Sequence, residues 1–221
     1  MKVSFALVCE GSSDSSLIPH IQELFVRYGA TEVSGEYADL TCFPRVGSSV
    51  KNKVDAVVTL MPHINVIIVH RDGDGVGAVG RELEIIEQTA HVKGKKIIPI
   101  IPIRMLEAWL ILDEQAIRDV VGNSGSKVRL DLPTPISVEG VRDPKVKLYQ
   151  TLEVASELTG ARLKKFKKRL PAMRRRLAES LSPLGLVSQT ESHARFCSYL
   201  KSYLNAVPFV EGDTCYRRSA T

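Results

Sequence analysis

The sequence lacks the features that mark several protein classes. Its 221 residues include four cysteines, and these form no C-x-x-C pair with histidines at zinc-finger spacing, so a zinc module is not expected. Cys9 and Cys42 end apolar runs, which favours buried free thiols and a reducing, cytoplasmic setting. No apolar run is long enough for a membrane span, and the run in residues 1–10 lacks a signal-peptide cleavage site.

Acidic residues become scarce towards the end of the chain, although the composition as a whole is that of a soluble globular protein. Residues 161–221 contain 13 Lys and Arg against 4 Asp and Glu, a net charge of +9. Residues 1–160 contain 17 Lys and Arg against 21 Asp and Glu, a net charge of −4, and the two parts sum to the overall net charge of +5. An acidic part joined to a basic part is typical of a protein that binds a metal ion and a polyphosphate.

Hydrophobic periodicity predicts strands and helices in strict alternation over the first half of the chain. The expected strands are residues 2–9, 37–43, 64–70 and 96–103, and the expected helices are about 14–28, 48–60, 79–91 and 104–121. With right-handed crossovers, this order gives an α/β fold with three layers and a mostly parallel four-stranded sheet. Pro99 and Pro102 indicate that the fourth strand is at an edge or irregular.

A glycine- and proline-rich loop at residues 122–144 marks the end of this α/β unit, which we place at residues 1–121. The pattern after the loop is helical, at about 145–158, 160–179 with a break at Pro171, and 189–206. We therefore expect a basic helical extension over residues 145–207, followed by a tail of residues 208–221 with no strong pattern.

Residues 64–75 are the most informative stretch, because an apolar β-branched run is followed by a glycine-rich turn. Such a run is typical of a strand buried on both faces of a parallel sheet. Asp72 and Asp74 follow it, and side chains two residues apart on extended backbone point to the same side. A divalent cation such as Mg²⁺ would relieve their repulsion. The alternative is a turn with two solvated aspartates.

Acidic residues follow three of the four expected strands. Glu10 follows the first strand, Asp72 and Asp74 the third, and Glu107 the fourth, while Asp14 lies four residues after Glu10. The carboxyl ends of parallel strands share one edge of the sheet, so these acids can converge on one site. Asp14 is equally well explained as a helix cap, and Glu107 as an acid that favours the helix dipole. Glu10 has no such structural role.

These acids stand in motifs that resemble the Toprim domain, the metal-binding α/β fold of topoisomerases, bacterial primases and OLD-type nucleases. The motifs are E-G-x-S-D at 10–14 and D-x-D at 72–74, each after an apolar strand, and the resemblance covers roughly residues 1–121. R-x-x-E-A-W-L-x-x-D at 104–113 and D-P-K at 143–145 are similar to a small bacterial family of stand-alone Toprim-like proteins. Members of that family are often encoded beside an AAA-type ATPase in phage-defence loci.

The resemblance implies a Mg²⁺- or Mn²⁺-dependent nuclease that hydrolyses phosphodiester bonds in DNA or RNA, as the effector of an ATPase-coupled defence system. It implies metal ligation by Glu10, Asp14, Asp72, Asp74 and Glu107, with Arg104 stabilising the transition-state charge. Lys95 and Lys96 are further candidates for the basic residue that assists OLD-type nucleases. The chain is short for a topoisomerase with its tyrosine-bearing domain, and its cysteines do not suit a primase zinc module.

The expected nucleic-acid interface is a run of basic residues on the helical extension. It comprises Arg162, Lys164, Lys165, Lys167, Lys168, Arg169, Arg174, Arg175 and Arg176. On a helix these charges cover more than one face, and a phosphate backbone would neutralise them with release of counterions. The alternatives are a solvated helix, or a helix that docks on an acidic partner or on the acidic part of the same chain.

Two rival functions remain open on the sequence. The D-G-D-G stretch at 72–75 also fits a haloacid-dehalogenase-type phosphatase with Asp72 as nucleophile. That reading expects the motif after the first strand, but here it follows the third. It also expects a further acidic pair after a later strand, whereas residues 161–221 contain only four acids, none of them adjacent. The second rival is a non-catalytic Toprim-like subunit that binds metal or nucleic acid within an ATPase complex.

Overall fold

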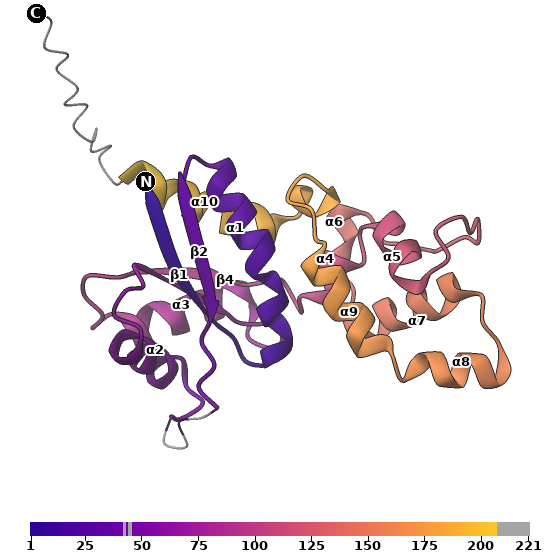
Figure 1. Cartoon of the computed structure of the whole chain (residues 1–221), viewed down its shortest axis with the longest axis horizontal. Helices are drawn as coiled ribbons and strands as arrows, with labels where there is room; N and C mark the ends of the chain where they lie inside the picture. The colour runs from indigo at the N-terminus through magenta and orange to yellow at the C-terminus, as the bar shows by residue number, and fades with distance from the viewer. Residues whose placement is uncertain (42, 44–45, 207–221) are drawn as a thin grey trace, which may run out of the picture.

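A parallel four-stranded sheet forms the centre of the α/β part in the computed structural model, which describes residues 1–41, 43 and 46–206 (Figure 1). The strands are β1 Lys2–Val8, β2 Glu32–Tyr37, β3 Val66–His70 and β4 Lys96–Ile100, in the spatial order β2-β1-β3-β4. β4 is an edge strand, as Pro99 within it predicts. β1 and β3 are neighbours, with Val8 paired to Val69, so the chain leaves both strands at adjacent points of one edge.

Alternate residues of the central strands enter two separate apolar cores. Phe5 and Leu7 face the core that includes helix α1, Ile18–Arg27, whereas Ala6 and Val8 face the core that includes α2, Val50–Leu60. Helix α10, Glu191–Ala206, joins α1 on the first face, and α3, Gly77–Thr89, joins α2 on the second (Figure 1). The three-layer, parallel α/β architecture predicted from the sequence is therefore confirmed.

A group of helices lies beside the sheet, on the right of Figure 1. It contains α4 Glu107–Leu110, α5 Glu114–Val121, α6 Pro135–Val138, α7 Pro144–Ser156, α8 Gly160–Lys167 and α9 Leu170–Glu179, and the 3₁₀ helices are η1 Ser12–Leu17 and η2 Leu186–Gln189. Helices α4 and α5 pack against α7 and α9, whereas α10 returns to pack on β4. Contacts thus cross the boundary expected at residue 121, and the expected tail, 208–221, lies outside the described residues. No helix in the described part of the chain is long and apolar enough to cross a membrane.

Three predicted elements are wrong in position or continuity. The second strand is Glu32–Tyr37 instead of 37–43, because this edge strand has only one neighbour, is mostly half-buried, and therefore carries a weak apolar pattern. The predicted helix 104–121 is divided between α4 and α5, since Asp113 caps α5 by accepting a hydrogen bond from the Ala116 N–H. The break predicted at Pro171 lies before it, because proline is well tolerated in the first turn of a helix.

Candidate metal-binding carboxylate site

The adjacent ends of β1 and β3 place Glu10 and Asp72 on the wall of one cavity of about 360 Å³. Its other walls come from η1, the segment before α4, and the helices α7 and α9. The cavity is lined by Glu10, Gly11, Ser13, Asp14, Asp72, Met105, Glu107, Lys145, Tyr149, Pro171 and Arg174. The structure therefore brings together four of the acids predicted from the sequence, although the first and the last are 97 positions apart.

The Asp72 carboxyl has a raised pKa and one buried oxygen atom. Its Oδ1 atom is buried and has no hydrogen-bond partner among the described residues. Burial raises the pKa of Asp72 from its ordinary value of 3.8 to about 6; His70 opposes this rise, and the negative charges of Asp14, Glu107 and Glu10 add to it. The cavity therefore holds negative charge that the side chains around Asp72 do not neutralise.

Glu10 is held at the edge of the cavity by an arginine from the segment after β3. Its Oε1 atom lies 3.0 Å from Nε of Arg71, and its side chain remains 45% exposed. Arg71 is also paired with Glu84, which is in turn paired with Arg81. Arg81 donates a hydrogen bond to the Asp72 carbonyl oxygen, so this network fixes the backbone that carries Asp72. Glu10 keeps contact with solvent despite its ion pair.

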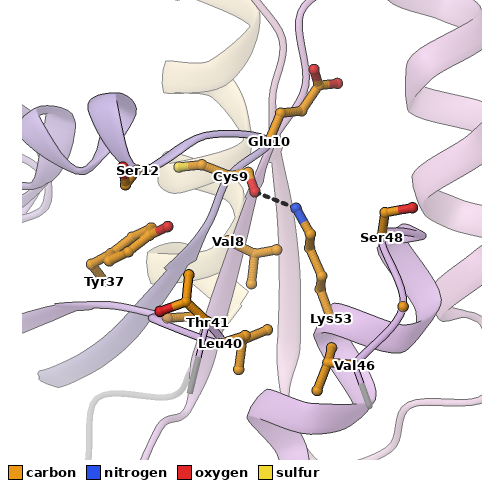
Figure 2. A pocket seen from close by; sticks show the side chains of 12 residues that line it. Val8, Cys9, Glu10, Ser12, Tyr37, Leu40, Thr41, Val46, Ser48 and Lys53 are labelled. Carbon is orange, nitrogen blue, oxygen red and sulfur yellow. Dashed lines mark hydrogen bonds between the residues drawn. The ribbon is translucent and has the colours of Figure 1, made fainter. Parts of the chain in front are cut away.

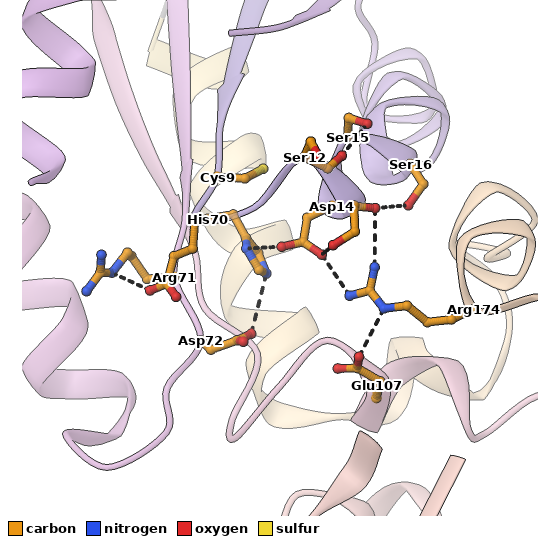
Figure 3. Close-up of polar contacts among 12 residues, drawn as sticks. Cys9, Ser12, Asp14, Ser15, Ser16, His70, Arg71, Asp72, Glu107 and Arg174 are labelled. Carbon is orange, nitrogen blue, oxygen red and sulfur yellow. Dashed lines mark hydrogen bonds and ion pairs between the residues drawn. The ribbon is translucent and has the colours of Figure 1, made fainter. Parts of the chain in front are cut away.

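Arg174 joins the other two carboxylates (Figure 3). Its Nη2 lies 2.7 Å from Asp14 Oδ1, its Nε lies 3.0 Å from Glu107 Oε1, and its Nη1 donates to the Ser13 carbonyl oxygen. All three charged side chains are at most 10% exposed. Burial lowers the pKa of Arg174, but the charges of Glu107 and Asp14 outweigh it and raise the pKa overall. Arg174 was predicted to contact nucleic acid at the surface; instead it forms part of the cavity wall.

Asp74 is not brought to the cavity. The extended backbone ends at His70, and the chain then turns, with the Gly77 N–H donating to the Gly73 carbonyl oxygen at 2.8 Å. The rule that residues two apart face the same side therefore does not apply beyond β3. The Asp74 side chain is half exposed and lies 3.5 Å from Arg104.

The basic residues expected to assist catalysis also lie outside this cavity. Arg104 is paired with Asp74 and has a φ of 72°, a conformation that non-glycine residues rarely adopt. Lys95 donates to the carbonyl oxygens of Pro62 and Ile64, which precede β3, and Lys96 begins β4. Both lysines therefore lie at the amino ends of the strands, whereas Glu10 and Asp72 follow the carboxyl ends of β1 and β3.

Lys145 and Tyr149 of α7 line the cavity and were not predicted as site residues. Asp143 caps α7 by accepting a hydrogen bond from the Val146 N–H, so D-P-K at 143–145 is the start of a helix. Lys145 is exposed and has no ion pair with any residue that the structure describes. The D-P-K motif indicates where α7 begins, whereas the position of Lys145 on the cavity wall depends on how α7 packs.

Eight of the nine predicted nucleic-acid-binding residues are exposed, and five of these lie on α8 or directly after it with no ion-pair partner in the described part of the chain; we call these five the α8 basic surface. They are Arg162, Lys164, Lys165, Lys168 and Arg169. By contrast, Lys167 is paired with Glu153 and Arg175 with Glu179, and Arg176 is exposed on α9. This surface adjoins α9, which carries Pro171 and Arg174 of the cavity wall.

No protein-family model matches the chain, and no curated protein or solved structure matches it. Chemically, the cavity is lined by the oxygens of four carboxylates and by one exposed lysine. Such oxygens are the ligands that Mg²⁺ and Mn²⁺ take in proteins, and the lysine is suited to an anionic substrate.

Proposed function

We propose that the protein is a Mg²⁺- or Mn²⁺-dependent Toprim-type nuclease that hydrolyses phosphodiester bonds in DNA or RNA in the cytoplasm. The observation that carries the proposal is the half-buried Asp72 carboxylate, whose buried Oδ1 atom has no hydrogen-bond partner among the described residues and which shares a cavity with Glu10, Asp14 and Glu107. The role as effector beside an AAA-type ATPase in phage defence is proposed from the sequence motifs alone.

The donor set fits a hard cation. Glu10 and Asp72 would provide the principal ligands, because Asp14 and Glu107 each give one oxygen to Arg174. The partnerless Oδ1 of Asp72 is the kind of buried polar atom that a cation satisfies. When bound, Mg²⁺ would polarise a phosphoryl oxygen and lower the pKa of a bound water.

Other side chains would position the substrate. Lys145 reaches the same cavity as the carboxylates and would bind a phosphate oxygen of the nucleic-acid backbone. Arg174 holds Asp14 and Glu107 in fixed orientations, so the cavity wall needs little rearrangement when a substrate binds. The α8 basic surface would extend the phosphate contacts beyond the cavity.

Glu10→Gln is expected to lower Mg²⁺-dependent cleavage of DNA or RNA by at least about 100-fold, the order of effect seen when groups around metal sites are removed. The substitution preserves size and removes a cavity carboxylate. The measurement is the cleavage rate of labelled oligonucleotides in Mg²⁺ or Mn²⁺, with a chelator as blank. Asp74→Asn is the matched control, because its carboxylate is outside the cavity, and it should cleave at nearly the parent rate. Equal rates for Glu10→Gln and the parent would refute the assignment.

The double variant Lys164→Glu/Lys168→Glu is expected to bind nucleic acid more weakly, because it removes phosphate contacts from the α8 basic surface. The slope of log affinity against log salt should become shallower by about 2 for duplex DNA, since each lost contact removes about 0.9. The control Lys93→Glu/Lys96→Glu makes the same charge change at the far edge of the sheet. If both variants lose affinity equally, net charge is responsible and the α8 basic surface is not the interface.

The alternative function is a non-catalytic subunit that binds metal or nucleic acid. The ion pairs of Arg174 favour it, because they occupy one oxygen each of Asp14 and Glu107. Protein that binds Mg²⁺ and nucleic acid but cleaves neither DNA nor RNA with any divalent metal would support this alternative. A phosphatase would instead hydrolyse aryl phosphates through an aspartyl-phosphate intermediate on Asp72.

A further inference from the structure

Cys9, Asp14 and His70 form a second, mixed cluster, which shares Asp14 with the carboxylate cavity (Figure 3). One potential ligand atom from each residue lies within 4.8 Å of the other two, and all three residues are buried. Cys9 follows β1, His70 ends β3, and Asp14 is on η1. The segment that runs from β1 into η1 and the end of β3, which are distant in sequence, therefore present sulfur, oxygen and nitrogen to one point.

His70 provides an independent indication that a ligand belongs at this point. Its side chain is 1% exposed, and neither ring nitrogen has a hydrogen-bond partner among the described residues. Nδ1 lies 3.5 Å from Asp14 Oδ2, and Nε2 lies 3.8 Å from Asp72 Oδ1, both beyond ordinary hydrogen-bond distance. A buried imidazole with no hydrogen bond to either nitrogen is costly, and native proteins rarely contain one.

We propose that Cys9, Asp14 and His70 bind a transition-metal ion of the zinc class, in addition to the proposed Mg²⁺ site. A thiolate, an imidazole and a carboxylate are together a donor set for Zn²⁺ and similar ions, whereas Mg²⁺ takes oxygen ligands. Ligand atoms of tetrahedral zinc lie about 3.3–3.8 Å apart, so side-chain movements of about 1 Å would close the cluster.

The surroundings of the cluster match those of a metal site. With the metal at Nδ1, the proton of His70 is on Nε2 and faces Asp72, the carboxylate–histidine–metal arrangement that orients a ligating imidazole. Asp14 would ligate through Oδ2 while Oδ1 accepts from Arg174 Nη2, so the ligating carboxylate is itself anchored. Glu10, Asp72 and Glu107 then remain for Mg²⁺.

A separate cavity of about 330 Å³ offers an access route to this cluster (Figure 2). Cys9 is on its wall together with Ser12 and Tyr37, and the Nζ of Lys53 donates to the Cys9 carbonyl oxygen at 2.7 Å. Lys53 thus fixes the backbone of Cys9 without engaging its sulfur. A metal ion would approach Cys9 from this cavity, which shares Glu10 with the carboxylate cavity.

Binding of Co²⁺ to the purified chain tests the proposal, because a thiolate ligand gives cobalt an intense charge-transfer band in the near ultraviolet. The parent should bind one tight equivalent of Zn²⁺ or Co²⁺ and show this band, and Cys9→Ser should lose it. Cys197→Ser should keep it; this matched control removes another buried cysteine whose sulfur lies 3.5 Å from a histidine, His193. Glu10→Gln should also keep the band.

A parent chain with no cobalt band, or a Cys9→Ser variant with the full band, overturns the proposal. If circular dichroism shows that Cys9→Ser is unfolded, the variant with Cys42, Cys197 and Cys215 all changed to Ser leaves Cys9 as the sole cysteine. That variant should keep the band, and its absence refutes the site. Failure here is distinct from failure of the nuclease proposal, which is decided by cleavage in Mg²⁺ by Glu10→Gln.

Discussion

Asp72→Asn is expected to abolish Mg²⁺-dependent cleavage and, at pH 7.5, to stabilise the metal-free protein. The folded state resists ionisation of this carboxyl, whose pKa of about 6 is well above the ordinary 3.8. That difference corresponds to at most about 3 kcal/mol, so the neutral variant should gain about 1–3 kcal/mol in free energy of unfolding. Loss of activity with a gain in stability is typical of a residue kept for function.

The stability difference between Asp72→Asn and the parent should depend on pH. Below pH 3.8 the carboxyl is protonated in both the folded and the unfolded state, so Asp72→Asn and the parent should be equally stable. As the pH rises towards 6, the unfolded state ionises first and the parent loses stability relative to the variant. Above pH 6 the carboxyl is ionised in both the folded and the unfolded state, so the difference in free energy of unfolding stays at its full value. Urea unfolding at pH 4.5 and pH 7.5 measures it, and an equal difference at both values would contradict the assignment.

Mg²⁺ should remove most or all of this difference in free energy of unfolding at pH 7.5. Binding to the folded parent adds about 2.7 kcal/mol at a concentration of about 100 times the Kd, whereas Asp72→Asn should gain little. Asp74→Asn is the matched control, because its carboxylate is half exposed and outside the cavity, and it should respond to Mg²⁺ like the parent. If the Asp72→Asn variant gains as much from Mg²⁺ as the parent, the ion binds elsewhere.

Arg174→Ala is expected to destabilise the protein by about 3–5 kcal/mol, because it leaves two buried carboxylates without their cation. The neighbouring Arg175→Ala is the matched control on the same helix. Arg175 is 64% exposed and paired only with Glu179, four residues along the helix, so its loss should cost less than about 1 kcal/mol. Denaturant unfolding of both variants at neutral pH makes the comparison.

A compensating variant separates the charge effect from lost packing. In Arg174→Met with Asp14→Asn and Glu107→Gln, the buried charges are removed together, and most of the lost stability should return. If Arg174→Ala and Arg175→Ala have equal effects, Arg174 does not neutralise Asp14 and Glu107 in solution.

The convergence of Glu10, Asp14, Asp72 and Glu107 could be predicted because it depends on chain order. A right-handed β-α-β sequence of elements places all strand ends at one edge of a parallel sheet. The apolar runs before Glu10 and Asp72 were strong enough to locate β1 and β3. No long-range contact had to be known in advance.

Other parts of the site depend on contacts that the sequence does not encode locally. Residues 174–176 are all arginines, so residue type does not show which of them is buried. Only the rotation of α9 turns Arg174 towards Asp14 and Glu107, which are 160 and 67 positions away in the sequence. Asp74 lies outside the expected site because the backbone turns after His70. The approach of Cys9 to His70 likewise follows from the β1–β3 register, which the sequence alone leaves open.

The central claim is that Glu10 and Asp72 bind one cation at the edge of the sheet. A crystal structure of the protein soaked in Mn²⁺, with anomalous scattering to locate the ion, tests this most directly. We predict manganese within coordination distance of carboxylate oxygens from both residues. A soaked crystal whose cavity contains no manganese, with Glu10 still paired to Arg71 and Asp72 facing only His70, would contradict it.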